Sequence, residues 1–527
     1  MLKHSSLFYY AGGGRLLSSK EQYQLYSIAT QLITKNDFHL LMFNQKEDEV
    51  WLEKTNKKDT YVIRLTTKSF DWKNHLKMDV AKLFHQVKMM RKVLTGKRIF
   101  IYNLYVSSLT PIDDWSELKR PVRTDEKNSP EMHILYLEEE TINKQLSTID
   151  ESIIEEPIHV NDLSDVESYE RAVVSDKRQL INTYDKQQRE LKNIFSAGKP
   201  TLTFILIVTN IFMFYLLETS GGSADIRHLI ESGANYNPAI MDGEWWRLLS
   251  SMFLHIGFFH LLMNMFALYY LGMAVERIFG STRFIAIYFL AGIGGSVASF
   301  TFSPSVSAGA SGAIFGLFGA LLFFGMNHKR LFAQTMGKNI VMIIGINILI
   351  GFLIPQIDHA AHLGGLIFGF IASAIVHLPK KKHFAYQLSS LVVYVALFFS
   401  LALFGLHHNV TNEIVYLNKI EDHIEDENFT TVVEVATEAL NHSNDYEKEI
   451  LFNRSYAYIE LESYEAALDD LEEVISIDDD FSEAHYNLAL LYMDMDEMDK
   501  AKQSIEKAYD IKPNEQLYED LYNQLID

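Results

Sequence analysis

The sequence predicts a polytopic all-α membrane protein: a seven-helix bundle with a soluble α/β or α+β domain before it and an α-helical solenoid after it. Three observations lead to this fold class. Apolar runs crowd between Thr201 and Leu406, whereas both flanks are rich in charge. Short alternating runs in the first flank are typical of strands, and a helical pattern repeats in the second. A chain of 527 residues has room for about three domains, which we expect at 1–199, 200–407 and 411–527.

The first flank is expected to form a soluble domain built on strands. Five runs have strand patterns, and Val80 to Leu94 has a helical one. The strand-like runs are Phe38 to Phe43, Glu49 to Leu52, Tyr61 to Leu65, Ile99 to Val106 and His133 to Leu137. Glu167 to Phe195 has the pattern of a charged amphipathic helix that leads into the first apolar run. We expect this helix to be a linker that transmits position rather than chemistry.

A short stretch of this flank resembles a nuclease motif. Asp48-Glu49-Val50-Trp51-Leu52-Glu53-Lys54 is similar to the acid and Glu-x-Lys pattern of the restriction-endonuclease-like fold. The supporting metal ligands that a nuclease needs are not evident. We therefore expect no nucleic-acid partner.

Seven apolar segments are long enough to cross a bilayer, or nearly so. The fourth and fifth are short. The segments are Thr201 to Leu217, Trp246 to Leu271, Phe284 to Phe302, Ser311 to Met326, Ile340 to Ile354, Ala360 to Val376 and Leu388 to Leu406. Met1 to Arg15 lacks the apolar core of a signal peptide, so the N-terminal region is expected to stay in the cytosol. The chain has no cysteine, which excludes disulfides and thiol catalysis.

Lysine and arginine residues predict how these segments are oriented. Alternate loops carry the basic residues: Arg277 and Arg283; Lys329, Arg330 and Lys338; Lys380, Lys381 and Lys382. The opposite loops, Glu218 to Trp245, Ser303 to Ala310 and Pro355 to His359, carry only Arg227. By the positive-inside rule the first set is cytoplasmic. In a multi-pass protein of the cell membrane with seven spans, the N-terminal domain is then cytoplasmic and the C-terminal domain extracytoplasmic.

The second flank is strongly acidic. From Thr411 onward, 7 lysines and arginines stand against 32 aspartates and glutamates, and the rest of the chain has 40 against 36. Acidic segments are translocated with little penalty, because basic residues carry the orientation signal. A solubilising surface explains this charge more simply than a specific basic partner.

The same flank contains a repeat. Five residues recur after 34 positions: Asn453, Tyr458, Ala467, Leu471 and Ile477 become Asn487, Tyr492, Ala501, Ile505 and Ile511. This period resembles the tetratricopeptide repeat (TPR). A weaker copy precedes it, with Ile424, Val433 and Leu440 in register, and Leu517 to Leu525 has the pattern of a capping helix. Such solenoids usually bind peptides or helices, so we expect a protein partner, with packing against the membrane domain as the alternative.

Three motifs in the apolar region carry chemistry. They are Gly309-Ala310-Ser311-Gly312, Ala361-His362-Leu363-Gly364-Gly365, and His260-Leu261-Leu262-Met263-Asn264. Polar groups within a bilayer are expensive and are normally kept for function or paired within a bundle. A serine, a histidine and two further hydrogen-bond donors near membrane depth are the parts of a serine hydrolase. The pattern therefore predicts an intramembrane protease.

Together these motifs resemble the rhomboid proteases. Gly309 to Gly312 matches their GxSG, Ala361 to Gly365 with Gly369 matches AHxxGxxxG, and His260 with Asn264 matches HxxxN. Trp246-Arg247 and Glu276-Arg277 also fit. The order of soluble domain, seven spans and TPR tail is similar to the long rhomboids of Gram-positive bacteria. Two departures are the additional His359, and Phe315 where relatives often have tyrosine.

The residues suggest a division of roles. Ser311 needs a base to become a nucleophile, and His362 lies in a small-residue setting where helices can approach. Phe315, one turn after Ser311, is expected to hold the imidazole by ring stacking. Gly365 and Gly369 form a face for close approach of the sixth helix to the fourth, and Gly309 and Gly312 support the serine.

His260 and Asn264 are expected to stabilise the transition state. They are four residues apart on one helix and so face one side. With the Ser311 N–H they would hold the oxyanion of a tetrahedral intermediate. The alternative for Asn264 is an interhelical hydrogen bond. His255, expected to cap or brace the first outer loop, and His359 stay outside this set.

The predicted activity is peptide-bond hydrolysis in or beside the transmembrane segments of membrane-protein substrates, in the lipid bilayer, without cofactor or metal. One alternative is a metal-binding membrane protein that uses His255, His260, Asp358, His359 and His362. No HExxH occurs and the histidine spacing forms no usual zinc triad. A second alternative is an inactive rhomboid-like module that only binds membrane proteins, against which the intact serine and histidine argue.

Overall fold

The computed structural model describes residues 19–56, 58–90, 94, 98–123, 129–138, 141–150, 152–353, 357–379, 383–442 and 445–526. The chain forms two compact units, one made of residues 1–196 with 324–341 and the other of 197–323 with 342–527. Two predictions, the absence of a signal peptide in Met1 to Arg15 and the basic loop Lys380 to Lys382, lie outside the described residues.

The N-terminal region contains a mixed five-stranded sheet in the order β1-β2-β3-β4-β5. The three strands β1 (His39–Asn44), β2 (Glu49–Asn56) and β3 (Asp59–Thr66) are antiparallel neighbours, and β4 (Arg98–Val106) and β5 (Glu131–Leu137) continue in parallel. All five predicted strands are confirmed. The predicted helix is α2 (Lys73–Met89), which links β3 to β4 and begins earlier than expected.

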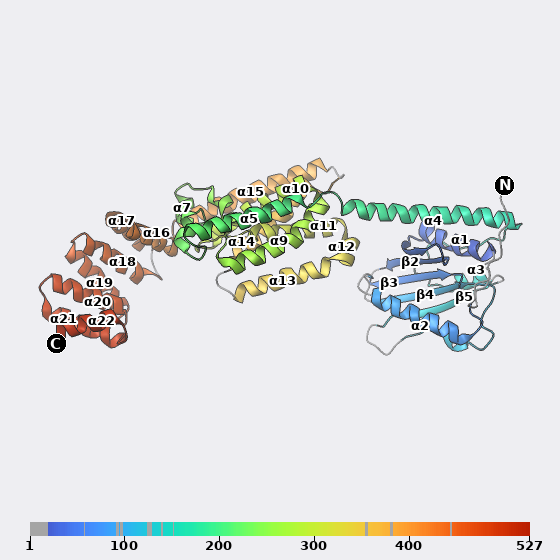
Figure 1. The fold of residues 1–527 in the computed structure, drawn as a ribbon, viewed down its shortest axis with the longest axis horizontal. Helices are drawn as coiled ribbons and strands as arrows, with labels where there is room; N and C mark the ends of the chain where they lie inside the picture. The colour runs from blue at the N-terminus through green and yellow to red at the C-terminus, as the bar shows by residue number, and fades with distance from the viewer. Residues whose placement is uncertain are drawn as a thin grey trace. The chain divides into compact units, whose positions relative to one another are not determined.

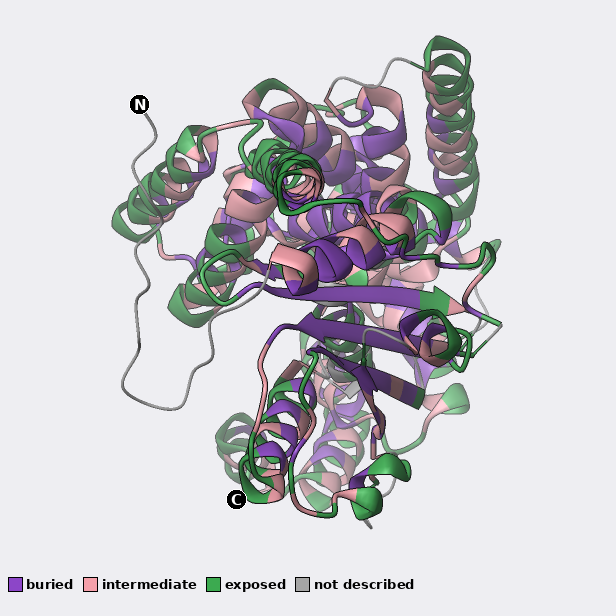
Figure 2. Cartoon of the chain, turned by 90° about the vertical axis from the view of Figure 1, so that its right-hand side faces the viewer, coloured by how far each residue is buried: buried purple, intermediate pink, exposed green. Residues whose placement is uncertain are grey.

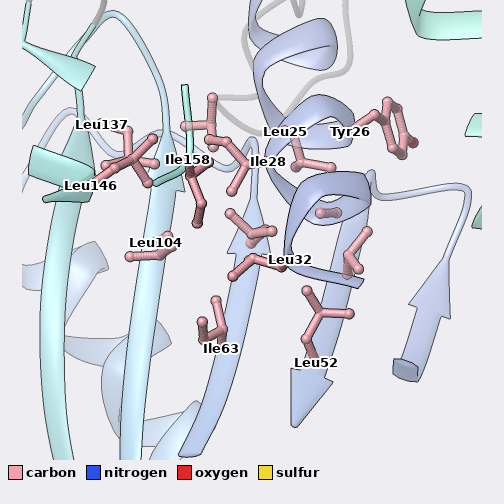
Figure 3. Packing of buried hydrophobic residues seen from close by; sticks show 14 of the residues in the cluster. Leu25, Tyr26, Ile28, Leu32, Leu52, Ile63, Leu104, Leu137, Leu146 and Ile158 are labelled. Carbon is pink, nitrogen blue, oxygen red and sulfur yellow. The ribbon is translucent and has the colours of Figure 1, made fainter. Parts of the chain in front are cut away.

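Helices cover both faces of this sheet (Figure 1). α1 (Ser19–Lys35) and α4 (Val166–Ile194), the predicted amphipathic helix, lie on one face, and α2 lies on the other. Leu25, Ile28 and Leu32 of α1 pack over the strands (Figure 3). The strands are buried while the helices expose their outer faces (Figure 2). The short helices η2 (Ser116–Lys119) and α3 (Ile142–Leu146) complete the region.

The nuclease-like residues do not converge. Asp48 precedes β2, where it accepts hydrogen bonds from Tyr26 and Gln22 and pairs with Lys177. Lys54, about 20 Å along an extended strand, is bonded to the Asn36 and Ile153 carbonyls at 2.9 and 3.1 Å. These charged groups fasten helices and loops to the two ends of one strand.

Five helices in the described part of the chain are long and apolar enough to cross a membrane: α5 (Thr201–Ser220), α9 (Gly257–Phe279), α10 (Ser281–Phe302), α14 (His359–Val376) and α15 (Phe384–Asn409). The predicted fourth and fifth segments are the 17-residue helices α11 (Ser311–Asn327) and α13 (Gly337–Leu353). Shorter elements connect them: α6 (Ile226–Glu231), α7 (Asn237–Met241), α8 (Arg247–Ser250), η3 (Ser251–Phe253) and α12 (Lys329–Thr335).

The predicted second span, Trp246 to Leu271, has the wrong limits. Trp246 and Arg247 belong to the connecting region, and the helix begins only at Gly257, whose φ of +74° ends the preceding extended stretch. The helix continues to Phe279, and only Gly280 separates it from α10. Arg277 and Arg283 therefore lie on helix ends, not in a loop.

The two additional motif pairs have structural roles. Glu276, fully buried on α9, accepts hydrogen bonds from the Leu202 and Thr203 N–H groups at 3.1 and 2.9 Å, so it caps the start of α5. Arg247 donates to the Ile230 and Ala234 carbonyls at 2.5 and 3.2 Å and so fastens the loop between α5 and α9.

The C-terminal region consists of paired helices. They are α16 (Glu413–Glu425), α17 (Phe429–Leu440), α18 (Glu447–Glu460), α19 (Tyr464–Ile477), α20 (Ser482–Asp494), α21 (Met498–Ile511) and α22 (Gln516–Ile526). The repeat positions Ala467 and Ala501 are fully buried, as the 34-residue period predicts. The weaker first copy is the pair α16 and α17, and the predicted capping helix is α22.

Candidate active site

The site is built where α11 and α14 cross. An added Cβ at Gly365 would lie 2.0 Å from the Gly312 carbonyl oxygen, and one at Gly369 would lie 2.3 Å from the Gly316 Cα. No side chain fits between these backbones. The predicted close approach of the two helices is therefore confirmed, and the space between their backbones is too small for even one added methyl group.

Ser311 is the first residue of α11 and is half-buried. Two residues before it, Gly309 has φ +153° and donates its N–H to the Ser251 carbonyl at 2.9 Å. An added Cβ at Gly309 would lie 3.0 Å from the His260 ring and 3.7 Å from the Ser311 hydroxyl oxygen. Glycine at this position lets the imidazole of His260 and the Ser311 hydroxyl approach the same point of the backbone.

His362 lies in the first turn and a half of α14 and is half-buried. Its ring stacks on Phe315 with 4.1 Å between ring centroids and 10° between planes. The predicted stacking is confirmed. Phe315 is buried and follows Ser311 by one turn of α11, so the same helix that carries the serine fixes the plane of the histidine ring.

His260 and Asn264 lie on one face of α9, as their spacing predicts. His260 is half-buried and Asn264 is buried. The Asn264 Nδ2 donates to the His260 carbonyl at 2.9 Å within the helix, not across to another helix. A carboxamide has two N–H donors, so this bond leaves Asn264 a second donor.

His255, which is expected to cap or brace the first outer loop, contacts the segment that precedes Ser311. It lies in the connection before α9, fully buried, and its Nε2 accepts the Ala310 N–H at 3.4 Å. Burial lowers the pKa of His255 to about 3, so the ring is neutral and can accept. His255 and the Ser251 carbonyl together brace the segment that precedes Ser311. Its one sequence signal is the position five residues before His260.

Asp358 and His359 lie at the start of α14. Asp358 caps this helix by accepting the Ala361 N–H at 2.8 Å, and its other oxygen accepts the Ser299 hydroxyl at 2.5 Å. His359 is the first residue of the helix. Across the described residues, no three histidine, cysteine, aspartate or glutamate side chains are grouped so that they could hold a metal ion.

Comparison with known proteins decides the family. Residues 242–379 match the family model of the rhomboid domain, and residues 458–525 match a tetratricopeptide repeat model. The chain is 35% identical to rhomboid protease GluP of Bacillus subtilis (strain 168), over 96% of this chain and 98% of that protein. The chain belongs to the rhomboid family. This rhomboid is also 40% identical to RHOMBOID-like protein 5 of Arabidopsis thaliana, over 28% of this chain and 50% of that protein.

Membership gives the class of activity. The rhomboid is a multi-pass membrane protein and an intramembrane serine protease that acts on membrane-protein substrates, with a repeat region of a protein-binding type. The motif residues gather around α9, α11 and α14, the helices that carry the serine, both site histidines and the asparagine. What each residue does there is a question of chemistry.

Proposed function

We propose that Ser311 and His362 are the catalytic dyad of this rhomboid, with Ser311 as nucleophile and His362 as general base. The observation that carries this proposal is the stacking of Phe315 on His362, with 4.1 Å between the ring centroids. Phe315 lies one helical turn after Ser311, so the stacking brings His362 to the helix that carries the serine. A serine hydroxyl needs an adjacent base to attack a carbonyl. No third residue is needed to orient the base, because Phe315 fixes the ring and Asp358 is already bonded to Ser299 and Ala361.

His260, Asn264 and the Ser311 N–H are the proposed oxyanion donors. His260 approaches the Gly309 backbone together with the Ser311 hydroxyl, which supports a place for its ring beside the attacked carbonyl. Donors that are fixed before the reaction stabilise developing charge without reorganisation, and losing one costs about 3 kcal/mol in comparable sites. Gly309 keeps this space free of a side chain, whereas an added Cβ at Gly312 would face the Ala361 carbonyl oxygen of α14 at 3.4 Å.

The proposed reaction proceeds through an acyl-enzyme. His362 takes the proton of the Ser311 hydroxyl as the serine oxygen bonds to the carbonyl carbon of the substrate. The same proton then passes to the amine, which leaves as the peptide C–N bond breaks. Water attacks the resulting ester by the reverse sequence and releases the second product. A substrate helix must unwind to present its backbone, so a segment weakened by glycine is the expected cleavage region.

Cleavage of a transmembrane substrate by the full-length protein in liposomes tests the dyad. Ser311→Ala and His362→Ala should each abolish cleavage while the folded protein stays in the membrane. The double variant should be no worse than either single one, because the two residues act as a unit. Cleavage that persists in Ser311→Ala would end this proposal.

The proposed topology has seven spans, with domain limits at 1–199, 200–407 and 411–527. It counts α11 and α13 as spans beside the five longer helices, which the positive-inside rule supports. The N-terminal domain is then cytoplasmic, where a regulatory role fits it, and the TPR region faces outward, where it recruits or positions substrates. Since the chain has no cysteine, single cysteines report on each side separately.

Lys82→Cys and Gln503→Cys place one thiol on an exposed position of each soluble region. A membrane-impermeant maleimide added to intact protoplasts should label Gln503→Cys and spare Lys82→Cys until the cells are lysed. Protection of both thiols would remove one span from the count and move the TPR region to the cytoplasmic side.

A further inference from the structure

α16, the first helix of the TPR region, is bonded to the loop that joins α5 to α9. The Tyr236 hydroxyl donates to Asp422 at 2.7 Å. Arg227 pairs with Glu425, and lies 3.6 Å from Asp426. These bonds connect one face of α16 to the region of α6 and α7.

The helix makes two further polar contacts with the membrane domain. Lys419 lies 3.4 Å from Asp242, and the Asn418 Nδ2 donates to the Pro304 carbonyl at 3.5 Å. The acceptor at Pro304 lies in the segment between α10 and α11. A single TPR helix thus reaches two loops of the membrane domain, the one between α5 and α9 and the one between α10 and α11.

Tyr236 is the buried member of this contact. Its side chain is 4% exposed, whereas Arg227 is half exposed to solvent. Exposed ion pairs contribute little because water screens them. Burial raises the pKa of Asp422 above its ordinary value, as expected for a carboxylate that this contact removes from water. The hydrogen bond between Tyr236 and Asp422 is therefore the contact that specifies the position of α16.

A short backbone path leads from Tyr236 to the serine. Its neighbour Asn235 forms a bridge with Ser307, in which each N–H donates to the other's carbonyl at 2.8 and 2.9 Å. Ser307 precedes Gly309 by two residues, and Gly309 adjoins His260 and the Ser311 hydroxyl. The Asn235 Nδ2 also donates to the Ser296 carbonyl of α10 at 2.9 Å, so the bridge is fixed to the bundle.

The residue after Tyr236 is anchored as well. The Asn237 Nδ2 donates to the Ser303 carbonyl at 2.9 Å and to the Asn409 side-chain oxygen at 3.2 Å. Asn409 ends α15 and donates to the Phe300 carbonyl at 2.8 Å. Tyr236 therefore lies between two buried asparagines that join the loop to the ends of α10 and α15.

From this arrangement we propose that Tyr236 and Asp422 are positioning residues of the protease, which use the first TPR helix to hold the Asn235–Ser307 bridge and with it the Gly309–Ser311 segment. α16 is then part of the support of the active site and not a detachable module. This inference rests on the proposed role of Ser311, because it concerns the placement of that residue.

A double-mutant cycle in the full-length protein tests the inference. Tyr236→Phe removes the donor and Asp422→Ala removes the acceptor. Each should lower kcat and the rate at which a fluorophosphonate labels Ser311 by about three- to tenfold, less than the roughly hundredfold loss of a full 1 Å misplacement. KM should stay within about twofold of the native value, and the double variant should match the single ones.

Two control variants distinguish a role in positioning the active site from an effect on folding. Asp422→Asn keeps an acceptor oxygen and should restore the native kcat. Lys507→Gln breaks an exposed ion pair with Asp479 elsewhere in the TPR region and should leave kcat and labelling unchanged. Native kcat and labelling in Tyr236→Phe and Asp422→Ala, or effects that add in the double variant, would overturn the inference. Activity that Ser311→Ala does not abolish would overturn the proposed function instead.

Discussion

In the α11–α14 crossing the backbones meet through glycine, whereas the TPR helices are separated by buried alanine, leucine and tyrosine side chains. An added Cβ at Gly365 would lie 2.0 Å from a backbone oxygen. At the TPR repeat position Ala467 a methyl group is already present and fully buried. The α11–α14 crossing has no room for a further side chain, and the TPR region has ordinary side-chain packing. The glycine contact holds the helices of Ser311 and His362 close together, whereas the TPR helices stack through their side chains.

The largest effect is expected from one methyl group at the crossing. Gly365→Ala forces α14 away from α11, and because His362 lies on α14, kcat should fall by about a hundredfold or more. The measurement is single-turnover cleavage by the full-length protein in liposomes. Gly345→Ala is the matched control, since an added Cβ there, on α13, meets nothing within 4 Å. An equal loss of kcat in both variants would show that the effect does not depend on the close contact of α11 and α14.

The proposed oxyanion donors should give the next largest effect on kcat. His260→Ala and Asn264→Ala are expected to lower kcat by roughly ten- to a thousandfold, with little change in substrate binding, because the donors act on charge that forms only in the transition state. Steady-state kinetics together with a binding assay on the uncleaved substrate separate the two quantities. A comparable loss of binding, or a collapsed melting temperature, would count against this role.

Substitutions of Phe315 test whether ring stacking orients His362, the proposed base. Phe315→Leu removes the ring that stacks on His362 and should lower kcat by about tenfold, while Phe315→Tyr keeps the ring and should stay near the native rate. Progress curves at several substrate concentrations measure kcat and KM for both variants. Equal rates in the two variants would mean that the stacking does not orient the imidazole.

Removing a methyl group from the TPR region, the opposite of adding one at the α11–α14 crossing, should have the smallest effect on catalysis. Ala467→Gly removes one buried methyl group and loosens α19, which costs about 1–2 kcal/mol of local stability. Hydrogen exchange of α18 to α21 should therefore accelerate while kcat is unchanged. A loss of kcat without a change in exchange would contradict the separation of the two packing types.

How far the sequence predicts this molecule depends on the kind of signal. The 34-residue period, the five strand patterns and the glycine spacing at Gly365 and Gly369 are local, and the structure bears them out. The sequence does not predict the start of α9, because Trp246 to Ile256 is apolar but forms only the short helices α8 and η3. Hydropathy does not distinguish such a stretch from part of a long helix. The contact of Ala310 with His255, and the capping of α5 by Glu276, depend on chain segments that meet only after folding.

Chemical labelling of the nucleophile tests the proposed dyad most directly. The full-length protein, reconstituted in liposomes, is treated with a fluorophosphonate and the labelled peptide is mapped by mass spectrometry, with and without a metal chelator. We expect one label on Ser311, unaffected by the chelator and lost in His362→Ala, with Gly365→Ala labelled far more slowly than Gly345→Ala. A label elsewhere, or labelling of Ser311 that persists at the native rate in His362→Ala, would contradict the proposed dyad.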